Sequence, residues 1–349
     1  MNKIVNKALF YKEWIYVKWI TLLTIAIILF SKAYEIISQL NQTTIFVQHN
    51  QIVWNDYWFN NGLYAENINV FIMILIVIIL AMTLFLGEKT SETQGFIASM
   101  PFTRKEMIFN KWLVGVVSLL ISFAVTYIFL SLFYLLKIKG LDTTINPYSD
   151  IIKWFFMNTF QYICIFTFMM LIQAVMGNSI VSGIVGGIIV MVPTFITMVA
   201  QNLIVRYYGY THYQYMIFYK LSSWLNICFY NLSQQSLVKT LINNDSAFAF
   251  SYYSNYKSKL LVFFLLTCLF LYLAYVAYKR RNIEYNLRLI GFKNLEPVFI
   301  MGFAICLGLL AGVIIGNQSL RKFGIYFIIF TIIGYFISKL LLKVLSSKK

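Results

Sequence analysis

Long stretches without a charged residue alternate with short charged segments along this chain. A helix needs about 20 apolar residues to cross the hydrocarbon core of a bilayer. The uncharged run from Trp154 to Val205 is too long for one span, so Gly177-Asn178-Ser179 is the predicted break within it. The pattern predicts membrane-spanning helices over residues 19–40, 67–87, 112–136, 154–176, 180–205, 260–278, 297–316 and 323–342.

The composition supports a membrane protein rather than a water-soluble one. Hydrophobic residues make up 60% of the 349 residues and charged residues only 11%, whereas soluble domains average about 25% charged residues. The net charge of +16 is typical of basic loops beside anionic lipid. No basic domain stands apart from the spans, which argues against a nucleic-acid partner. The expected fold class is an all-α polytopic membrane protein with about eight transmembrane helices.

The distribution of Lys and Arg predicts the orientation. With the N-terminus inside, sixteen of the 28 basic residues fall on cytoplasmic segments and eleven on external ones. Five of those eleven lie in one long external loop, where charge has little influence on topology. We therefore expect a multi-pass protein of the bacterial plasma membrane with both termini in the cytoplasm.

Two segments outside the spans have unusual composition. Residues 1–18 place apolar and basic residues at helical spacing, which predicts an amphipathic helix lying in the membrane plane; a simple basic flank is the alternative. Residues 206–259 are rich in tyrosine and poor in charge, which favours re-entrant or interfacial helices. Their tyrosines would anchor the interface or, alternatively, line a substrate exit.

Glycines within the predicted spans indicate close helix packing. Small residues four apart allow two helix backbones to approach. This spacing occurs in the fifth and seventh spans, at Gly183, Gly187, Gly308, Gly312 and Gly316.

Motifs for independent chemistry are missing from the chain. The sequence contains no nucleotide-binding glycine loop, no hydrolase signature and no metal-ligand spacing of Cys or His. No Asp or Glu lies deep in a predicted span, which disfavours ion-coupled transport. We therefore expect no catalytic residue, cofactor or metal in this chain. A transporter without coupling chemistry of its own needs a separate subunit that supplies the energy.

Residues 87–111 form the cytoplasmic loop with the most mixed charge. Glu88 and Glu92 are one helical turn apart, Pro101 breaks the chain, and Thr103 with Glu106 predicts a capping box at the start of the next helix. The pattern predicts a short surface helix that docks a soluble partner. The alternative is a solvated turn without a partner, although 25 residues are many for a turn.

This loop resembles the signature of the ABC type-2 exporter permeases. The resemblance lies in an acidic start, a glycine, an Ile-x-Ser-x-Pro-x-Thr-Arg stretch and a lysine before the third span, namely Glu88, Glu92, Gly95, Ile97, Ser99, Pro101, Thr103, Arg104 and Lys111. It implies that this loop is a coupling helix seated on an ABC ATPase subunit, which would hold the ATP and Mg²⁺. Gly177, Asn178 and Ser179 match the second, shorter coupling turn.

The same resemblance implies a division of the chain. Residues 1–18 would be the elbow helix and residues 19–280 a six-span permease core that works with a second copy or a related permease. Residues 281–349, with a cytoplasmic link and a final hairpin, depart from the six-span pattern. Relatives in Gram-positive bacteria export phenol-soluble-modulin or antimicrobial peptides, so an amphipathic peptide is the expected substrate. A membrane scaffold or sensor without ATPase contacts is the competing class.

Overall fold

The computed structural model describes residues 7–50, 58–65, 69–89, 102–138, 141, 143, 146–207, 212–239, 247–281, 293–316 and 319–346. Eight of its helices are long and apolar enough to cross a membrane, which confirms the all-α polytopic fold class. They are α1 (Lys7–Asn50), α3 (Asn69–Lys89), α5 (Arg104–Lys137), α6 (Ser149–Val175), α7 (Ser179–Tyr207), α9 (Tyr256–Arg280), α10 (Glu296–Ile315) and α11 (Leu320–Ser346).

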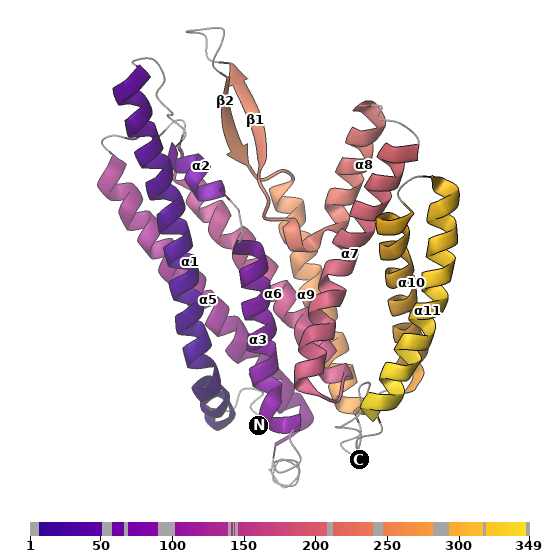
Figure 1. Ribbon diagram of the computed structural model, residues 1–349. Coiled ribbons are helices and arrows are strands. Elements are labelled where there is room, and N and C mark those ends of the chain that lie inside the picture. Colours follow the sequence, from indigo (N-terminus) through magenta and orange to yellow (C-terminus); the bar gives the residue numbers. More distant parts are fainter. Residues whose placement is uncertain are drawn as a thin grey trace.

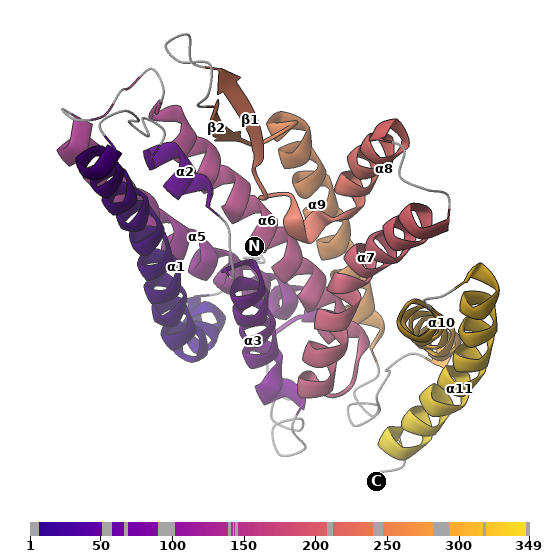
Figure 2. The same ribbon diagram turned by 45° about the horizontal axis from the view of Figure 1, so that its top comes forward.

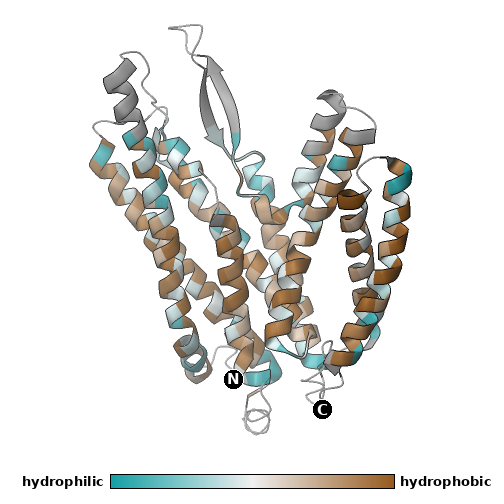
Figure 3. Cartoon of the chain, in the orientation of Figure 1, coloured by the Kyte–Doolittle hydropathy of each residue, from teal (hydrophilic) through white to brown (hydrophobic). Residues whose placement is uncertain are grey.

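The eight helices form one bundle whose spans alternate in direction (Figures 1 and 2). Helix α1 begins and α11 ends at the same end of this bundle, which we name the terminal face. The opposite end, here the hairpin face, carries the short helices and the strands. Apolar residues dominate the middle of the spans and polar residues gather towards their ends (Figure 3), as expected of helices with a bilayer for solvent.

Helix α6 is the centre of the bundle. It packs against α3, α5, α7 and α9, and 67% of its most apolar window is buried inside the protein, the largest share of any span. Its Asn158, Gln161 and Thr167 are buried, which is tolerated because each side chain is hydrogen-bonded. The break expected at Gly177-Asn178-Ser179 is found between α6 and α7.

The first helix begins before the first predicted span. Residues 7–18 are helical, as expected, and continue without interruption into the rest of α1, which ends at Asn50. No Gly or Pro occurs in that stretch to break it. Leu9 and Val17 are buried against the bundle, while Tyr11, Tyr16 and Trp19 are exposed, so one face of these turns packs and the aromatic face points outward.

The hairpin face carries the short elements. They are α2 (Trp58–Tyr64), α8 (His212–Leu225), the 3-10 turn η2 (Ile227–Phe229), β1 (Gln234–Lys239) and β2 (Ala247–Tyr252). A second 3-10 turn, η4 (Lys293–Leu295), precedes α10 at the terminal face. Strands β1 and β2 are antiparallel, with Gln234 opposite Tyr252.

The expectation of helices over residues 206–259 is therefore wrong for the two strands. The segment Ala-Phe-Ala-Phe-Ser-Tyr of β2 alternates small and aromatic residues with period two, which is a strand pattern. Two of the tyrosines, Tyr230 and Tyr253, are buried and belong to the core rather than to the interface.

The predicted packing glycines lie where helices approach closely. A Cβ on Gly187 of α7 would stand 2.8 Å from Cδ1 of Ile78 on α3, and Gly183 on the same face meets Met82 of α3. In the C-terminal pair, a Cβ on Gly312 of α10 would stand 2.7 Å from Cε2 of Phe323 on α11. Gly308 and Gly316 face α11 in the same way, so α10 and α11 form a tight hairpin beside α7.

Candidate functional site

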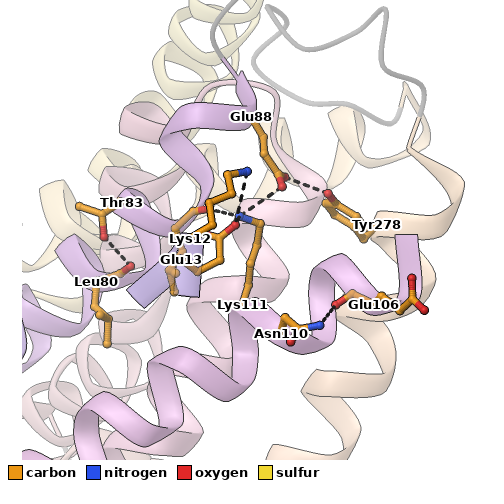
Figure 4. A network of polar contacts seen from close by, with 10 residues as sticks. Lys12, Glu13, Leu80, Thr83, Glu88, Glu106, Asn110, Lys111 and Tyr278 are labelled. Carbon is orange, nitrogen blue, oxygen red and sulfur yellow. Dashed lines mark hydrogen bonds and ion pairs between the residues drawn. The ribbon is translucent and has the colours of Figure 1, made fainter. Parts of the chain in front are cut away.

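A buried lysine joins three helices near the terminal face. Lys111 of α5 is 1% exposed, and its Nζ lies 2.9 Å from Oε1 of Glu13 on α1 and 3.2 Å from Oε1 of Glu88 on α3. The ammonium also donates to the Leu84 carbonyl oxygen. Figure 4 shows Lys111 between the two carboxylates.

The second carboxylate extends this cluster to a fourth helix. The Tyr278 hydroxyl of α9 donates to Oε2 of Glu88 at 2.8 Å. Glu13, Glu88, Lys111 and Tyr278, which we name the four-helix cluster, thus connect α1, α3, α5 and α9. Removing one charged partner from such a buried group leaves the others uncompensated, which is costly, so the cluster fixes these four helix ends relative to one another.

Helix α5 begins with a complete N-terminal cap. Thr103 accepts a hydrogen bond from the Glu106 amide at 3.2 Å, and the Glu106 carboxylate accepts one from the Thr103 amide at 2.9 Å. This is the capping box expected from the sequence.

Arg104 fastens this start to the end of α9. Its Nη1 donates to the carbonyl oxygens of Lys279 at 3.0 Å and Arg281 at 2.7 Å. These are carbonyls that a helix end leaves without intrahelical partners. Burial is the largest influence on the Arg281 guanidinium and lowers its pKa. Both ends of the segment between α3 and α5 are therefore attached to the end of α9. Glu88 makes the attachment at the first end and Arg104 at the second.

The turn between α6 and α7 is anchored by a second polar group. Asn178 is exposed, and its Oδ1 accepts from the amides of Ile180 at 2.9 Å and Val181 at 3.2 Å, capping α7. Ser179 donates to the Met82 carbonyl at 2.9 Å. Lys89 donates to Oε1 of Gln173 at 2.7 Å, so this turn is joined to the end of α3.

Another polar group lies inside the hairpin-face half of the bundle. Nε2 of Gln161 donates to the Cys228 carbonyl at 2.7 Å and to Oδ1 of Asn231 at 2.9 Å. Lys259 donates to the Tyr230 carbonyl at 3.1 Å. Burial raises the pKa of both Cys228 and Tyr230 to about 12, so both side chains are neutral at physiological pH. These contacts hold the segment after α8 down onto α6 and α9.

The sequence-predicted residues have different positions. Glu92, Gly95 and Pro101, with Ile97 and Ser99 of the motif, lie outside the described residues. Lys111 is buried and paired with the half-buried Glu88, and Thr103 and Arg104 lie at the start of α5. Gly177 and Ser179 are buried beside the exposed Asn178.

Sequence reasoning missed the partners of these residues. Glu13, Tyr278, Lys89 and Gln173 complete the two groups but belong to no motif. Glu13 carried one signal, because it is the sole acidic residue among the first 34. An isolated acid in a basic, apolar segment needs a cationic partner when it is buried.

Metal or cofactor chemistry has no centre in the described part of the chain. There, no three His, Cys, Asp or Glu side chains are grouped so that they could hold a metal ion. The polar groups described above connect helices and present no nucleophile with an adjacent base.

Comparison with known proteins identifies the family. A family model described as ABC-2 family transporter protein matches residues 10–283. The match runs from the first turns of α1 past the end of α9 and leaves α10 and α11 outside. No curated protein and no solved structure matches the chain. Because the match covers most of the chain, the protein belongs to the ABC-2 family of transporters and is a multi-pass transmembrane subunit of such a transporter, without an ATPase domain of its own.

Proposed function

We propose that this permease subunit exports an amphipathic peptide across the bacterial plasma membrane, driven by separate ABC ATPase subunits beneath its terminal face. Permeases of this family work with ABC ATPase subunits, which would supply ATP and Mg²⁺. The permease half is a pair, made of two copies of this chain or of this chain and a related permease. The main observation behind the proposal is that the segment between α3 and α5 is attached to α9 at both of its ends.

The attachment suggests how work from the ATPase reaches the spans. Residues 87–111 act as the coupling segment, and the turn at Gly177, Asn178 and Ser179 acts as the second, smaller contact. A push on the coupling segment moves Glu88 and Arg104, and these pull on α9 and, through Lys111, on α1 and α5. In this mechanism Glu88 and Lys111 position helices, and exposed residues of the segment make the contact with the ATPase.

The substrate class is supported by the character of the spans. Their interior is rich in aromatic and aliphatic side chains, and the buried lysine in the middle of α1, Lys32, donates to the Leu63 and Ala65 carbonyls at 3.0 and 2.7 Å. Spans of this composition suit a solute that is apolar along one face better than an ion.

Purification of the tagged chain in mild detergent from its native cells tests the partnership. Mass spectrometry should find an ABC ATPase in stoichiometric amount. A well-folded chain that never retains an ATPase would defeat the proposal and favour a scaffold or sensor role.

Replacement of Arg104 tests the coupling path. In inside-out vesicles containing the full complex, Arg104→Gln should reduce ATP-driven uptake of a fluorescent amphipathic helical peptide while ATP hydrolysis continues. Lys257→Gln removes the same charge from an exposed residue at the opposite end of α9 and should leave uptake unchanged. Equal uptake by both variants refutes the path through Arg104, and absence of peptide uptake by the native complex refutes the substrate class.

A further inference from the structure

An apolar cavity of about 190 Å³ lies between α6, α7 and α9. Cys164 and Phe168 of α6, Ile189 and Thr194 of α7, and Phe270 of α9 form its walls, and Cys228 of η2 closes it towards the hairpin face. No charged residue lines it. The cavity is separate from the four-helix cluster and from the polar turn between α6 and α7.

This cavity reaches the outer surface of the bundle. Ile189 lines it and is also 38% exposed. Helices α7 and α9 both pack on α6, whereas in the described part of the chain they make no substantial contact with each other. Their outward side chains nearby, such as Ile188 and Leu269, are exposed and apolar. The opening therefore faces the hydrocarbon of the bilayer.

The depth of the cavity excludes a lipid headgroup as its occupant. Cys164 lies near the middle of α6 (Ser149–Val175), and Thr194 lies near the middle of α7 (Ser179–Tyr207). Both helices span the membrane, so their centres lie at the level of acyl chains, where phosphate and glycerol groups do not reach.

The lining also disfavours water. Thr194 Oγ1 is buried without a hydrogen-bond partner, and the remaining walls are almost entirely apolar. A buried water needs two to four polar partners, and an apolar cavity of about 150 Å³ in another protein stays dry and binds benzene. A cavity of about 190 Å³ has room for the end of a hydrocarbon chain.

We propose that this cavity binds one acyl chain of a bilayer phospholipid, which enters past Ile189 and fills the space between α7 and α9. The occupant is a structural lipid that restores the packing these two helices do not make with each other. The site adds lipid binding to the proposed transport function and does not depend on the identity of the exported substrate.

Photo-crosslinking tests this site directly. The full chain is placed in nanodiscs of phosphatidylglycerol whose acyl chain carries a diazirine at its terminal carbon, and adducts are mapped by mass spectrometry. We expect adducts on Cys164 or Phe168 of α6 in addition to those on the outer surface of α9. Thr194→Phe should abolish the adducts inside the cavity, whereas Thr194→Val, which keeps the volume, should retain them.

The outer face provides the internal control. Adducts at Leu265 of α9, which is exposed, should be the same in every variant. Adducts at outer positions alone, or cavity adducts that persist in Thr194→Phe, overturn the proposal; so does labelling inside the cavity by a diazirine-bearing apolar peptide but not by the lipid. If Thr194→Phe does not give a normal size-exclusion profile, Cys164→Phe fills the same space from α6.

Discussion

Lys111 combines full burial with two acidic neighbours, Glu13 and Glu88. At the residue scale, Lys111 is important because a buried charge without a counter-ion destabilises the folded protein. In an apolar environment the two carboxylates repel each other, and the ammonium between them both cancels this repulsion and supplies hydrogen-bond donors. The same reasoning makes the more exposed Lys12, whose Nζ is 3.9 Å from Glu13, a minor contributor.

Substitution of Lys111 should therefore destabilise the folded protein strongly. We expect Lys111→Met to lower the free energy of unfolding in detergent by on the order of 3 kcal/mol, because both carboxylates lose their buried counter-ion. Lys12→Met is the control: its side chain is 39% exposed and lies 3.9 Å from Glu13, which keeps Lys111 as its counter-ion, so its loss should amount to less than about 1 kcal/mol. Equal losses in the two variants would contradict the central role of Lys111.

The thiol of Cys228 should be unreactive in the folded protein. Burial raises its pKa from an ordinary 9.0 to about 12, and its Sγ donates to the Val190 carbonyl at 3.4 Å. In a variant that keeps Cys228 alone, iodoacetamide at pH 8 should label this residue only after unfolding, because the thiolate is the reactive form. Leu232→Cys in the cysteine-free protein should be labelled while folded, since Leu232 is exposed.

The raised pKa of Cys228 also determines the direction in which the stability of the folded protein changes with pH. Below about pH 9 the thiol is neutral in both states and does not change stability with pH. Between pH 9 and pH 12 the unfolded thiol ionises first, so the stability due to this group falls as pH rises. Rapid labelling of folded Cys228 at pH 8 would show that its environment is more open than the structure indicates.

At the element scale, the helix pairs differ in what holds them together. The four-helix cluster joins α1, α3, α5 and α9 through charge and hydrogen bonds, whereas α10 and α11 meet through glycines and aromatic rings. Within a bilayer there is no hydrophobic drive between helices, so close van der Waals contact is the main attraction in the second kind of pair. Such a pair is sensitive to any added side chain at its contact face.

The glycine face of α10 allows a matched test. Gly312→Leu should separate α10 from α11, because even a Cβ there would stand 2.7 Å from the Phe323 ring, and overpacking typically costs about 1–3 kcal/mol. A Cβ on Gly302 of the same helix would meet no atom within 4 Å, so Gly302→Leu should be neutral. Limited proteolysis should then show faster cleavage at the C-terminal hairpin for Gly312→Leu alone, and identical patterns would argue against this packing.

At the scale of the whole molecule, the bundle has two dissimilar ends. Basic residues such as Lys12, Lys105 and Lys279 lie at the terminal face with the candidate coupling segment, and the strands and α8 lie at the hairpin face. From the positive-inside rule we expect the terminal face to lie in the cytoplasm. The family match ends at residue 283, so the hairpin of α10 and α11 is an addition to the six spans that the match covers.

Reporter fusions check this orientation. Green fluorescent protein fused at either terminus should fluoresce, and alkaline phosphatase inserted between β1 and β2 should be active, because both termini are expected inside and the strands outside. Fluorescence at one end only would contradict an even number of spans. Active phosphatase at the termini would invert the orientation.

Local patterns in the sequence determined the spans, the break at Gly177-Asn178-Ser179 and the capping box of Thr103 and Glu106. A run of about 20 residues without charge and the capping of a helix start both depend on residues that are close in the chain. They can therefore be recognised from the sequence alone. The resemblance in residues 87–111 also pointed to the family that the comparison identifies. The strand alternation of β2 was equally local, but it was obscured by the tyrosine-rich composition around it.

Only the tertiary structure decided which residues meet. Lys111 and Glu13 are 98 positions apart and Arg104 and Arg281 are 177 apart. Glu13 stands out as an isolated acidic residue, but nothing in the sequence identifies Lys111 as its partner. Such contacts arise because helix packing brings distant ends together at one depth in the membrane. There, a buried charge is tolerated only beside its counter-charge or hydrogen-bond partner, and the fold alone sets which side chain that is.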